Sequence, residues 1–133
     1  MEKMELLLRN SSTIAVVGLS PDPWRPSHEV TRYMREQGYT IIPVNPNHKE
    51  ILGLECYPDL LSVPGSVDIV NIFRRSQAVP AIVEQAITIK AGTVWMQLGV
   101  YHEEAARIAR EAGLTVIMER CIKIEHMRIF SAK

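Results

Sequence analysis

The 133-residue chain is long enough for one domain and too short for two, because most domains hold about 100–150 residues. Lys plus Arg and Asp plus Glu each number 15, so the net charge is zero, which argues against a nucleic-acid surface. The sequence has no secretory signal, no apolar stretch near the ~20 residues that span a bilayer, and no metal-ligand spacing at Cys56 or Cys121. We therefore expect a single cytoplasmic domain over residues 1–133, with reduced thiols and without a nucleic-acid, membrane or metal partner.

Helical and strand patterns alternate through the first half of the chain. A run of β-branched residues that ends in glycine, Thr13 to Gly18, is typical of a strand buried on both faces. Three prolines exclude regular structure between Leu19 and Pro26, after which Ser27 is expected to cap a helix. The predicted elements are a helix over 2–9, a strand over 13–18, a helix over 28–37, a strand over 39–44, an irregular loop over 47–66 with a helical turn near 59–61, and a third strand over 67–73.

The second half continues the same alternation. Its longest helical pattern covers 76–90, where Pro80 fits only in the first turn. A strand over 93–98, a helix over 102–112, a strand over 114–118 and a helix over 120–130 are predicted to follow. Buried strands that alternate with helices predict an α/β fold. We expect a doubly wound parallel sheet of about five strands in the order 3-2-1-4-5, with helices on both faces.

The turns that follow the strands contain most of the unusual residues. In doubly wound sheets the ligand crevice lies at the carboxyl ends of the strands where the strand order reverses, here between strands one and four. Gly18, Ser20 and Arg25 precede the helix that Ser27 opens, and free helix amides beside an arginine favour an anion such as pyrophosphate. The structural alternative is a proline-rich loop in which Ser27 only caps the helix. The other turns add Asn45-Pro46, Phe73-Arg74-Arg75 and Gln97-Leu98-Gly99.

The first turn lacks the fingerprint of dinucleotide-binding domains. Only Gly18 is present before Gly38, so the Gly-x-Gly-x-x-Gly spacing is absent. Asn45-Pro46 also stands where an NAD site carries an acidic residue for the ribose hydroxyls. The sequence therefore predicts the doubly wound fold but not a dinucleotide ligand such as NAD.

Six motifs follow one another in the order of a known family. They are Val17-Gly-Leu-Ser-Pro21, Arg25-Pro-Ser27, Ile42-Pro-Val-Asn-Pro46, Val70-Asn-Ile-Phe-Arg-Arg75, Trp95-Met-Gln-Leu-Gly99 and Arg120-Cys-Ile-Lys-Ile-Glu-His126. In these motifs the chain resembles the small stand-alone CoA-binding-domain proteins, which are relatives of the CoA-binding domain of the succinyl-CoA synthetase alpha subunit. The resemblance covers nearly the whole chain, from about Thr13 to His126.

The resemblance implies a Rossmann-like domain that binds coenzyme A or an acyl-CoA. It does not imply ligase chemistry, because the synthetase uses a phosphorylated histidine in a second domain that has no counterpart here. The residues that it assigns to CoA are Gly18, Ser20, Arg25 and Ser27 at the phosphates with Leu19 in the same turn, Asn45 and Pro46 beside the adenosine, Phe73 and Arg74 beside the nucleotide, and Gln97, Leu98 and Gly99 along the pantetheine.

Two classes of function remain open. The first is a module without catalytic residues that senses, stores or presents CoA or an acyl-CoA, with an unidentified protein as a possible recipient. The second is an enzyme on the same fold, either an NAD(P)-dependent oxidoreductase or a CoA-thioester-handling enzyme that uses Cys121. Arg120 and Lys123 beside Cys121 would favour its thiolate, but no general base lies near it in sequence. The alternative for Cys121 is a small buried apolar side chain.

Overall fold

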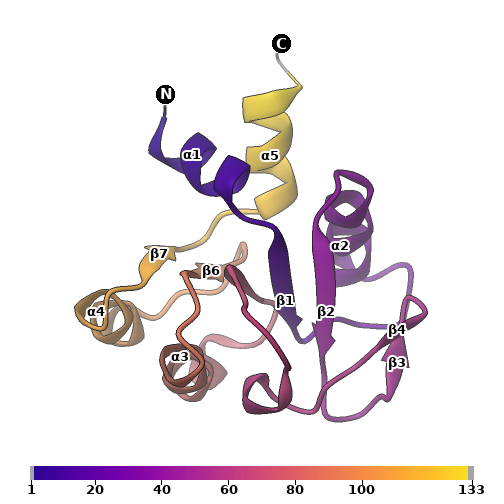
Figure 1. Ribbon diagram of the computed structural model, residues 1–133, viewed down its shortest axis with the longest axis horizontal. Coiled ribbons are helices and arrows are strands. Elements are labelled where there is room, and N and C mark those ends of the chain that lie inside the picture. The colour runs from indigo at the N-terminus through magenta and orange to yellow at the C-terminus, as the bar shows by residue number, and fades with distance from the viewer. Residues whose placement is uncertain (1, 132–133) are drawn as a thin grey trace.

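Parallel strands form the central sheet of the computed structural model, which describes residues 2–131 (Figure 1). The five strands of this sheet are hydrogen-bonded in the order β2-β1-β5-β6-β7. Their registers are parallel throughout, so all carboxyl ends meet at one edge. The strands are β1 (Thr13–Val17), β2 (Thr40–Val44), β5 (Ile69–Ile72), β6 (Thr93–Met96) and β7 (Thr115–Ile117).

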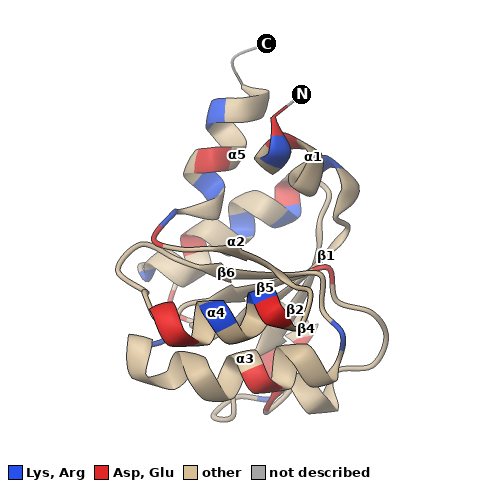
Figure 2. Ribbon diagram, turned by 90° about the vertical axis from the view of Figure 1, so that its left-hand side faces the viewer, with Lys and Arg blue, Asp and Glu red and all other residues tan. Residues whose placement is uncertain are grey.

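Helices cover both faces of the sheet, as the sequence predicts (Figures 1 and 2). Ile14 and Val16 belong to one apolar cluster with residues of α1, α2 and α5, whereas Ala15 and Val17 belong to the other with residues of α3 and α4. Because successive side chains of a strand point to opposite faces, one buried strand serves both cores. The helices are α1 (Lys3–Asn10), α2 (Pro26–Glu36), α3 (Val79–Thr88), α4 (Glu103–Glu111) and α5 (Ile122–Phe130).

The predicted strand order is wrong in the position of the third strand. β5 lies beside β1, so the large sheet has the order 2-1-3-4-5 when its strands are numbered along the chain, and the order reverses between β1 and β5. All four residues of β5 are buried, which requires neighbours on both sides. Pro43 in β2 lacks an N–H and therefore suits an edge strand.

The link from β2 to β5 explains how the chain crosses the sheet without an α-helix. A short hairpin of β3 (Glu50–Ile51) and β4 (Leu54–Glu55) is followed by the 3₁₀ turn η1 (Leu60–Ser62), where the sequence predicts a helical turn. Tyr57 forms a parallel bridge with Val44 and donates its backbone N–H to the Pro43 carbonyl. This contact covers the outer edge of β2, the place that the predicted order assigned to the third strand.

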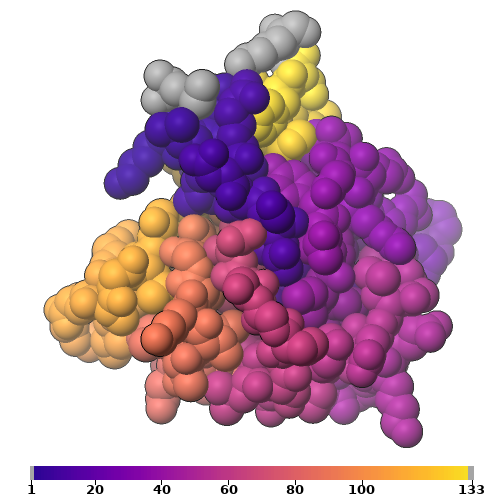
Figure 3. Space-filling view, viewed as in Figure 1, coloured from indigo at the N-terminus to yellow at the C-terminus, as the bar shows by residue number. Residues whose placement is uncertain are grey.

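The remaining predicted elements are present with ends shifted by a few residues. The helix predicted over 76–90 begins as the 3₁₀ turn η2 (Ser76–Ala78), and Pro80 lies in the first turn of α3, as expected. The helix predicted over 120–130 is present as α5. α1 packs on α5, so the two ends of the described chain lie side by side (Figure 3).

Charged residues of both signs are interspersed on the helices of the face that Figure 2 shows. Within residues 2–131 no helix has the length and apolar character needed to cross a membrane. The same residues include no group of three or more His, Cys, Asp or Glu side chains suited to hold a metal ion.

Candidate ligand-binding site

The turns after β1 and β5 meet where the strand order reverses. Gly18 has a φ of 88°, and a Cβ built on it would lie 2.5 Å from the Phe73 carbonyl oxygen and 2.8 Å from Cδ of Arg74. A larger residue is therefore excluded both by backbone conformation and by space. Since strands one and three of the large sheet flank this point, the predicted crevice between strands one and four is displaced by one strand.

A cavity of about 700 Å³ opens at this point along the carboxyl edge of the sheet. Its volume is within the usual range for a small-molecule site, about 300–1,000 Å³. Eight of the twelve residues predicted to bind a ligand line it. The lining residues are Gly18, Ser20, Arg25, Pro26, Ser27, Val30, Phe73, Arg74, Arg75, Gln97, Leu98, Val100 and Cys121.

A second cavity of about 970 Å³ continues from the first past the end of β2. The two cavities share Gly18 and three arginines, so they form one groove across the ends of β2, β1, β5 and β6. Asn45 and Pro46, predicted to contact a ligand, line this second part. Asn47, Gln77 and Ala78 complete it and were not predicted, because their sequence context carries no ligand signal.

Three arginines give the groove its positive charge. Arg25, Arg74 and Arg75 line both cavities, and none forms an ion pair or a side-chain hydrogen bond with any residue from 2 to 131. By contrast, four arginines elsewhere are paired with glutamates: Arg9, Arg107, Arg120 and Arg128. Unpaired guanidinium groups around a cavity are suited to bind the oxygens of a phosphate.

The loop between β1 and α2 is held by hydrogen bonds to the start of α2. The Ser27 hydroxyl accepts a hydrogen bond from the Ser20 backbone N–H at 3.0 Å, and His28 Nδ1 lies 3.0 Å from the Ser20 carbonyl oxygen. Ser27 therefore does not cap the helix as predicted; α2 begins at Pro26 with Arg25 at the N-cap position and no side-chain cap. Pro26 has no N–H and the His28 N–H donates to the Arg25 carbonyl at 3.1 Å, so among the first three residues of α2 only Ser27 keeps a backbone N–H without a partner in the described chain, and Ser27 lines the cavity.

Asn45 joins the ends of β1 and β2. Its Nδ2 donates to the Leu19 carbonyl at 3.0 Å, and its Oδ1 accepts from the Asn47 N–H at 2.9 Å. Both polar ends of this side chain are therefore engaged within the protein. Leu19 itself is fully buried in the core and lines neither cavity, so the structure does not bring this predicted contact residue to the groove surface.

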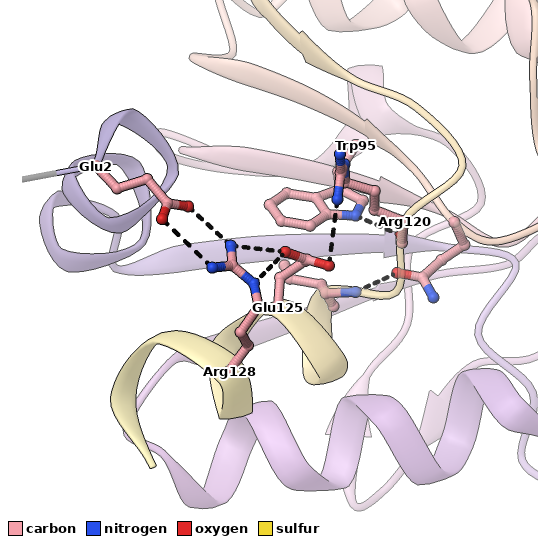
Figure 4. A network of polar contacts seen from close by, with 7 residues as sticks. Glu2, Trp95, Arg120, Glu125 and Arg128 are labelled. Atoms are coloured by element: carbon pink, nitrogen blue, oxygen red, sulfur yellow. Dashed lines mark hydrogen bonds and ion pairs between the residues drawn. The ribbon is translucent and has the colours of Figure 1, made fainter. Parts of the chain in front are cut away.

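Side chains at the end of β6 form hydrogen bonds with the backbone at the start of α5 (Figure 4). Trp95 Nε1 donates to the Arg120 carbonyl at 2.8 Å, and the Ile122 N–H donates to Gln97 Oε1 at 3.0 Å. Cys121 lies between these two fixed residues at the N-cap position of α5. The structure thus keeps Cys121 in the cavity wall, where it is 8% exposed.

The cations next to Cys121 in sequence are directed to carboxylates. Arg120 Nη1 lies 3.5 Å from Glu125 Oε2, and Lys123 pairs with Glu29 of α2. The expectation that these two charges favour a Cys121 thiolate is therefore not supported by their contacts. Their pairing instead ties α5 to α2 and to the turn after β7.

Glu125 is the centre of an ion-pair network that reaches the N-terminal helix (Figure 4). The buried carboxylate accepts hydrogen bonds from Arg128 at 2.9 and 3.1 Å, and Arg128 also donates to Glu2 at 2.8 Å. The hydrogen bond from Arg128 lowers the pKa of the Glu2 carboxyl group. This network fixes α1 on α5 and, through Arg120, supports the turn that carries Cys121.

Some residues at the site differ from the sequence prediction. Gly99, expected along a pantetheine, is absent from the described lining and serves the turn after β6, where its φ is 82°. Val30 and Val100, which were not predicted as site residues, form part of the apolar wall of the first cavity. Val30 follows from the helical periodicity of α2, but no local signal distinguishes Val100 from a core residue.

The fold and the groove define a class of protein: an α/β domain with a doubly wound parallel sheet and an arginine-lined groove at the carboxyl edge of that sheet. Residues 12–127 match the family described as the CoA binding domain. The chain belongs to this family, and the family assignment made from the sequence motifs is confirmed.

Relatives of two kinds are similar to this chain. The uncharacterized protein YneT of Bacillus subtilis is 46% identical over 120 residues, which span 90% of this chain and 89% of YneT. The ADP-forming acetate–CoA ligase I of Archaeoglobus fulgidus is 29% identical over 121 residues, or 82% of this chain, but the match spans only 17% of the ligase. A solved structure from Thermus thermophilus, cell-free ID.343, has a TM-score of 0.92 and 40% identity, covering 98% of this chain and 100% of that one.

Proposed function

We propose that the groove binds coenzyme A or an acyl-CoA and that the domain acts as a binding module rather than as an enzyme. The observation that carries the proposal is a cluster of three arginines, Arg25, Arg74 and Arg75, which surround the Gly18 turn in the groove and have no ion-pair partner in residues 2–131. CoA carries a pyrophosphate and a 3′-phosphate, so it presents several phosphate oxygens to such a cluster. The family match supports the choice of CoA among phosphate ligands.

The two ends of the groove support one orientation of the ligand. The positive charge lies between the two cavities, whereas Val30, Val100 and Cys121 form a mostly apolar wall at the α5 end. The adenosine would lie beside Asn45 and Pro46, the phosphates beside the arginines and the Ser27 N–H, and the pantetheine would run toward Cys121. A binding role accords with the relatives named acetate–CoA ligase, in which the matched region is a small part of a longer chain.

The test is a calorimetric titration of the purified protein with CoA, NAD and NADP under identical conditions. We expect CoA to bind and the two nicotinamide cofactors not to bind, because the site lacks a glycine fingerprint and an acidic residue at the end of β2. Native mass spectrometry of freshly purified protein would identify any CoA or acyl-CoA that co-purifies. Tighter binding of NAD than of CoA would overturn the proposal.

A CoA-thioester-handling enzyme is the second candidate function. The observation in its favour is that Cys121, a potential nucleophile, lines the cavity. No His, Asp or Glu appears in the lining of that cavity to act as its general base. Release of free CoA from acetyl-CoA by the protein, at a rate that Cys121→Ser abolishes, would favour the enzyme over the binding module.

A further inference from the structure

The Gln97 side chain has one polar end committed to the protein and the other free. Gln97 is 5% exposed and lines the cavity, and its Oε1 accepts the Ile122 N–H at 3.0 Å. The amide orientation is determined by this contact, because a reversed amide would place two donors against each other. Nε2 has no hydrogen-bond partner in residues 2–131.

The free Nε2 group faces the cavity. The buried side-chain atoms without a partner in the described chain are Thr31 Oγ1 and Asn71 Oδ1, so Gln97 Nε2 is not sealed inside the protein. Because Gln97 lines the first cavity and its Nε2 keeps accessible surface, the two N–H groups are available to a ligand in that cavity. A ligand that accepts a hydrogen bond from such a donor binds more tightly. A ligand that displaces the donor's water without replacing the hydrogen bond binds more weakly.

Apolar side chains line the same cavity as this donor. Val30 and Val100 are 5% and 7% exposed, and they line the same cavity as Cys121. Leu98, which follows Gln97, lines the cavity while 61% of its surface remains exposed. The chemistry that fits this end is a hydrogen-bond acceptor joined to a small apolar group.

We infer that the α5 end of the groove selects an acyl thioester over free CoA, with Gln97 Nε2 donating to the thioester carbonyl. This inference rests on the proposed CoA-binding function and names the substrate class of the same site. A carbonyl oxygen is a strong acceptor, whereas a thiol offers only a weak one. The acyl group would then lie against Val30, Val100 and Leu98. No covalent step is involved.

The experiment compares acetyl-CoA with S-ethyl-CoA, a thioether of the same chain length that lacks the carbonyl, and with CoA itself. For the wild-type protein we expect acetyl-CoA to bind about three- to tenfold more tightly than S-ethyl-CoA, the usual effect of one hydrogen bond. Equal affinities for the two analogues would overturn the inference. If none of the three ligands binds, the proposed function fails instead.

A matched variant separates the donor from the structural role of the side chain. Gln97→Glu keeps an oxygen for the Ile122 N–H but removes the N–H donor. We expect its preference for acetyl-CoA over S-ethyl-CoA to disappear, and retention of the wild-type preference would contradict the inference. Using the ratio within one variant cancels the repulsion between the new carboxylate and the CoA phosphates.

Infrared spectroscopy of the wild-type complex provides a readout that does not depend on a variant's folding. Acetyl-CoA labelled with ¹³C at the carbonyl should show its C=O stretch at lower frequency when bound than in an apolar solvent, because a donated hydrogen bond weakens the C=O bond. A bound frequency equal to that in the apolar solvent would exclude the contact.

Discussion

Gly18 and Arg74 show how single residues shape the groove. The missing side chain of Gly18 lets the β5 turn approach, and the Arg74 side chain lies directly over the space that a Cβ at position 18 would occupy. Arg74 therefore reaches the ends of β1 and β5 at once. A guanidinium held at this point without a carboxylate partner in residues 2–131 is available to a ligand anion.

Replacement of Arg74 by alanine tests this arrangement. We expect Arg74→Ala to weaken CoA binding by about 1.5–3 kcal/mol, the usual value of a charge-assisted hydrogen bond. Arg110→Ala is the matched control, since it removes the same charge from an exposed position on α4 that neither cavity includes. Calorimetric titration of the two variants measures the difference. Wild-type affinity in a folded Arg74→Ala protein would remove this residue from the site.

The two cysteines should differ in their reaction with CoA disulfide. Cys121 lines the cavity, whereas Cys56 donates its thiol hydrogen to the Asn45 carbonyl at 3.4 Å, and burial raises its pKa. We expect exchange between CoA disulfide and Cys121 to form a mixed disulfide and release one CoA thiolate.

Intact mass measured with and without reductant detects this adduct. The mass increase should be lost in Cys121→Ser and retained in Cys56→Ser. The reverse pattern would contradict the prediction, and no adduct in the wild-type protein would favour a buried, inert Cys121.

At the scale of the elements, the junction of α1, α2 and α5 depends on a buried histidine. His126 of α5 is 7% exposed, and its Nδ1 lies 2.8 Å from the Tyr33 hydroxyl of α2. Tyr39 and Phe130 pack on the same ring. Burial lowers the pKa of His126, because the charged imidazolium would lose its hydration.

This burial predicts a pH dependence of stability. With the pKa lowered in the folded state, the unfolded chain takes up the proton first. The His126 contribution is therefore complete above the unfolded pKa of about 6.5 and declines as the pH falls below it. Urea unfolding between pH 5.5 and 7.5 should show stability falling toward pH 5.5, and His126→Gln should make this dependence shallower. His48→Gln, at an exposed position, serves as the control and should leave it unchanged.

At the scale of the whole molecule, the order of the strands decides where the groove lies. Placing β5 beside β1 brings the Gly18 turn against the Phe73–Arg75 turn and centres the groove on both. A sheet in the predicted order would have placed one strand, β2, between these turns. The groove is therefore lined by the loops that follow four strands and by the residues at the starts of α2 and α5.

A ligand that contacts so many elements should stabilise the entire fold. CoA at about 100 times its dissociation constant is expected to add about 2.7 kcal/mol to the free energy of unfolding. Thermal unfolding followed by circular dichroism at increasing CoA concentration measures this as a rising Tm. A Tm that does not change while calorimetry reports binding would show that CoA binds the unfolded chain equally well.

Local patterns in the sequence were sufficient to predict the elements of the large sheet, its two helical layers and ten of the groove residues, but not the β3–β4 hairpin, which lies in the segment predicted as an irregular loop. Periodicity and turn chemistry act within a segment, so Gly18, Arg74 and Gln97 could be assigned to strand ends without knowledge of their neighbours. The sequence also contained a signal for the correct strand order, since Pro43 marks β2 as an edge strand.

Only the tertiary structure decided which strand lies beside β1, because this depends on the burial of β5 and on the contact of Tyr57 with β2. It also decided that Arg120 and Lys123 pair with glutamates rather than lie beside Cys121, and that Gln97 Oε1 accepts the Ile122 N–H. Each of these outcomes is a choice among partners distant in sequence. Such choices are settled by packing and hydrogen-bond satisfaction across the folded chain, which no local pattern records.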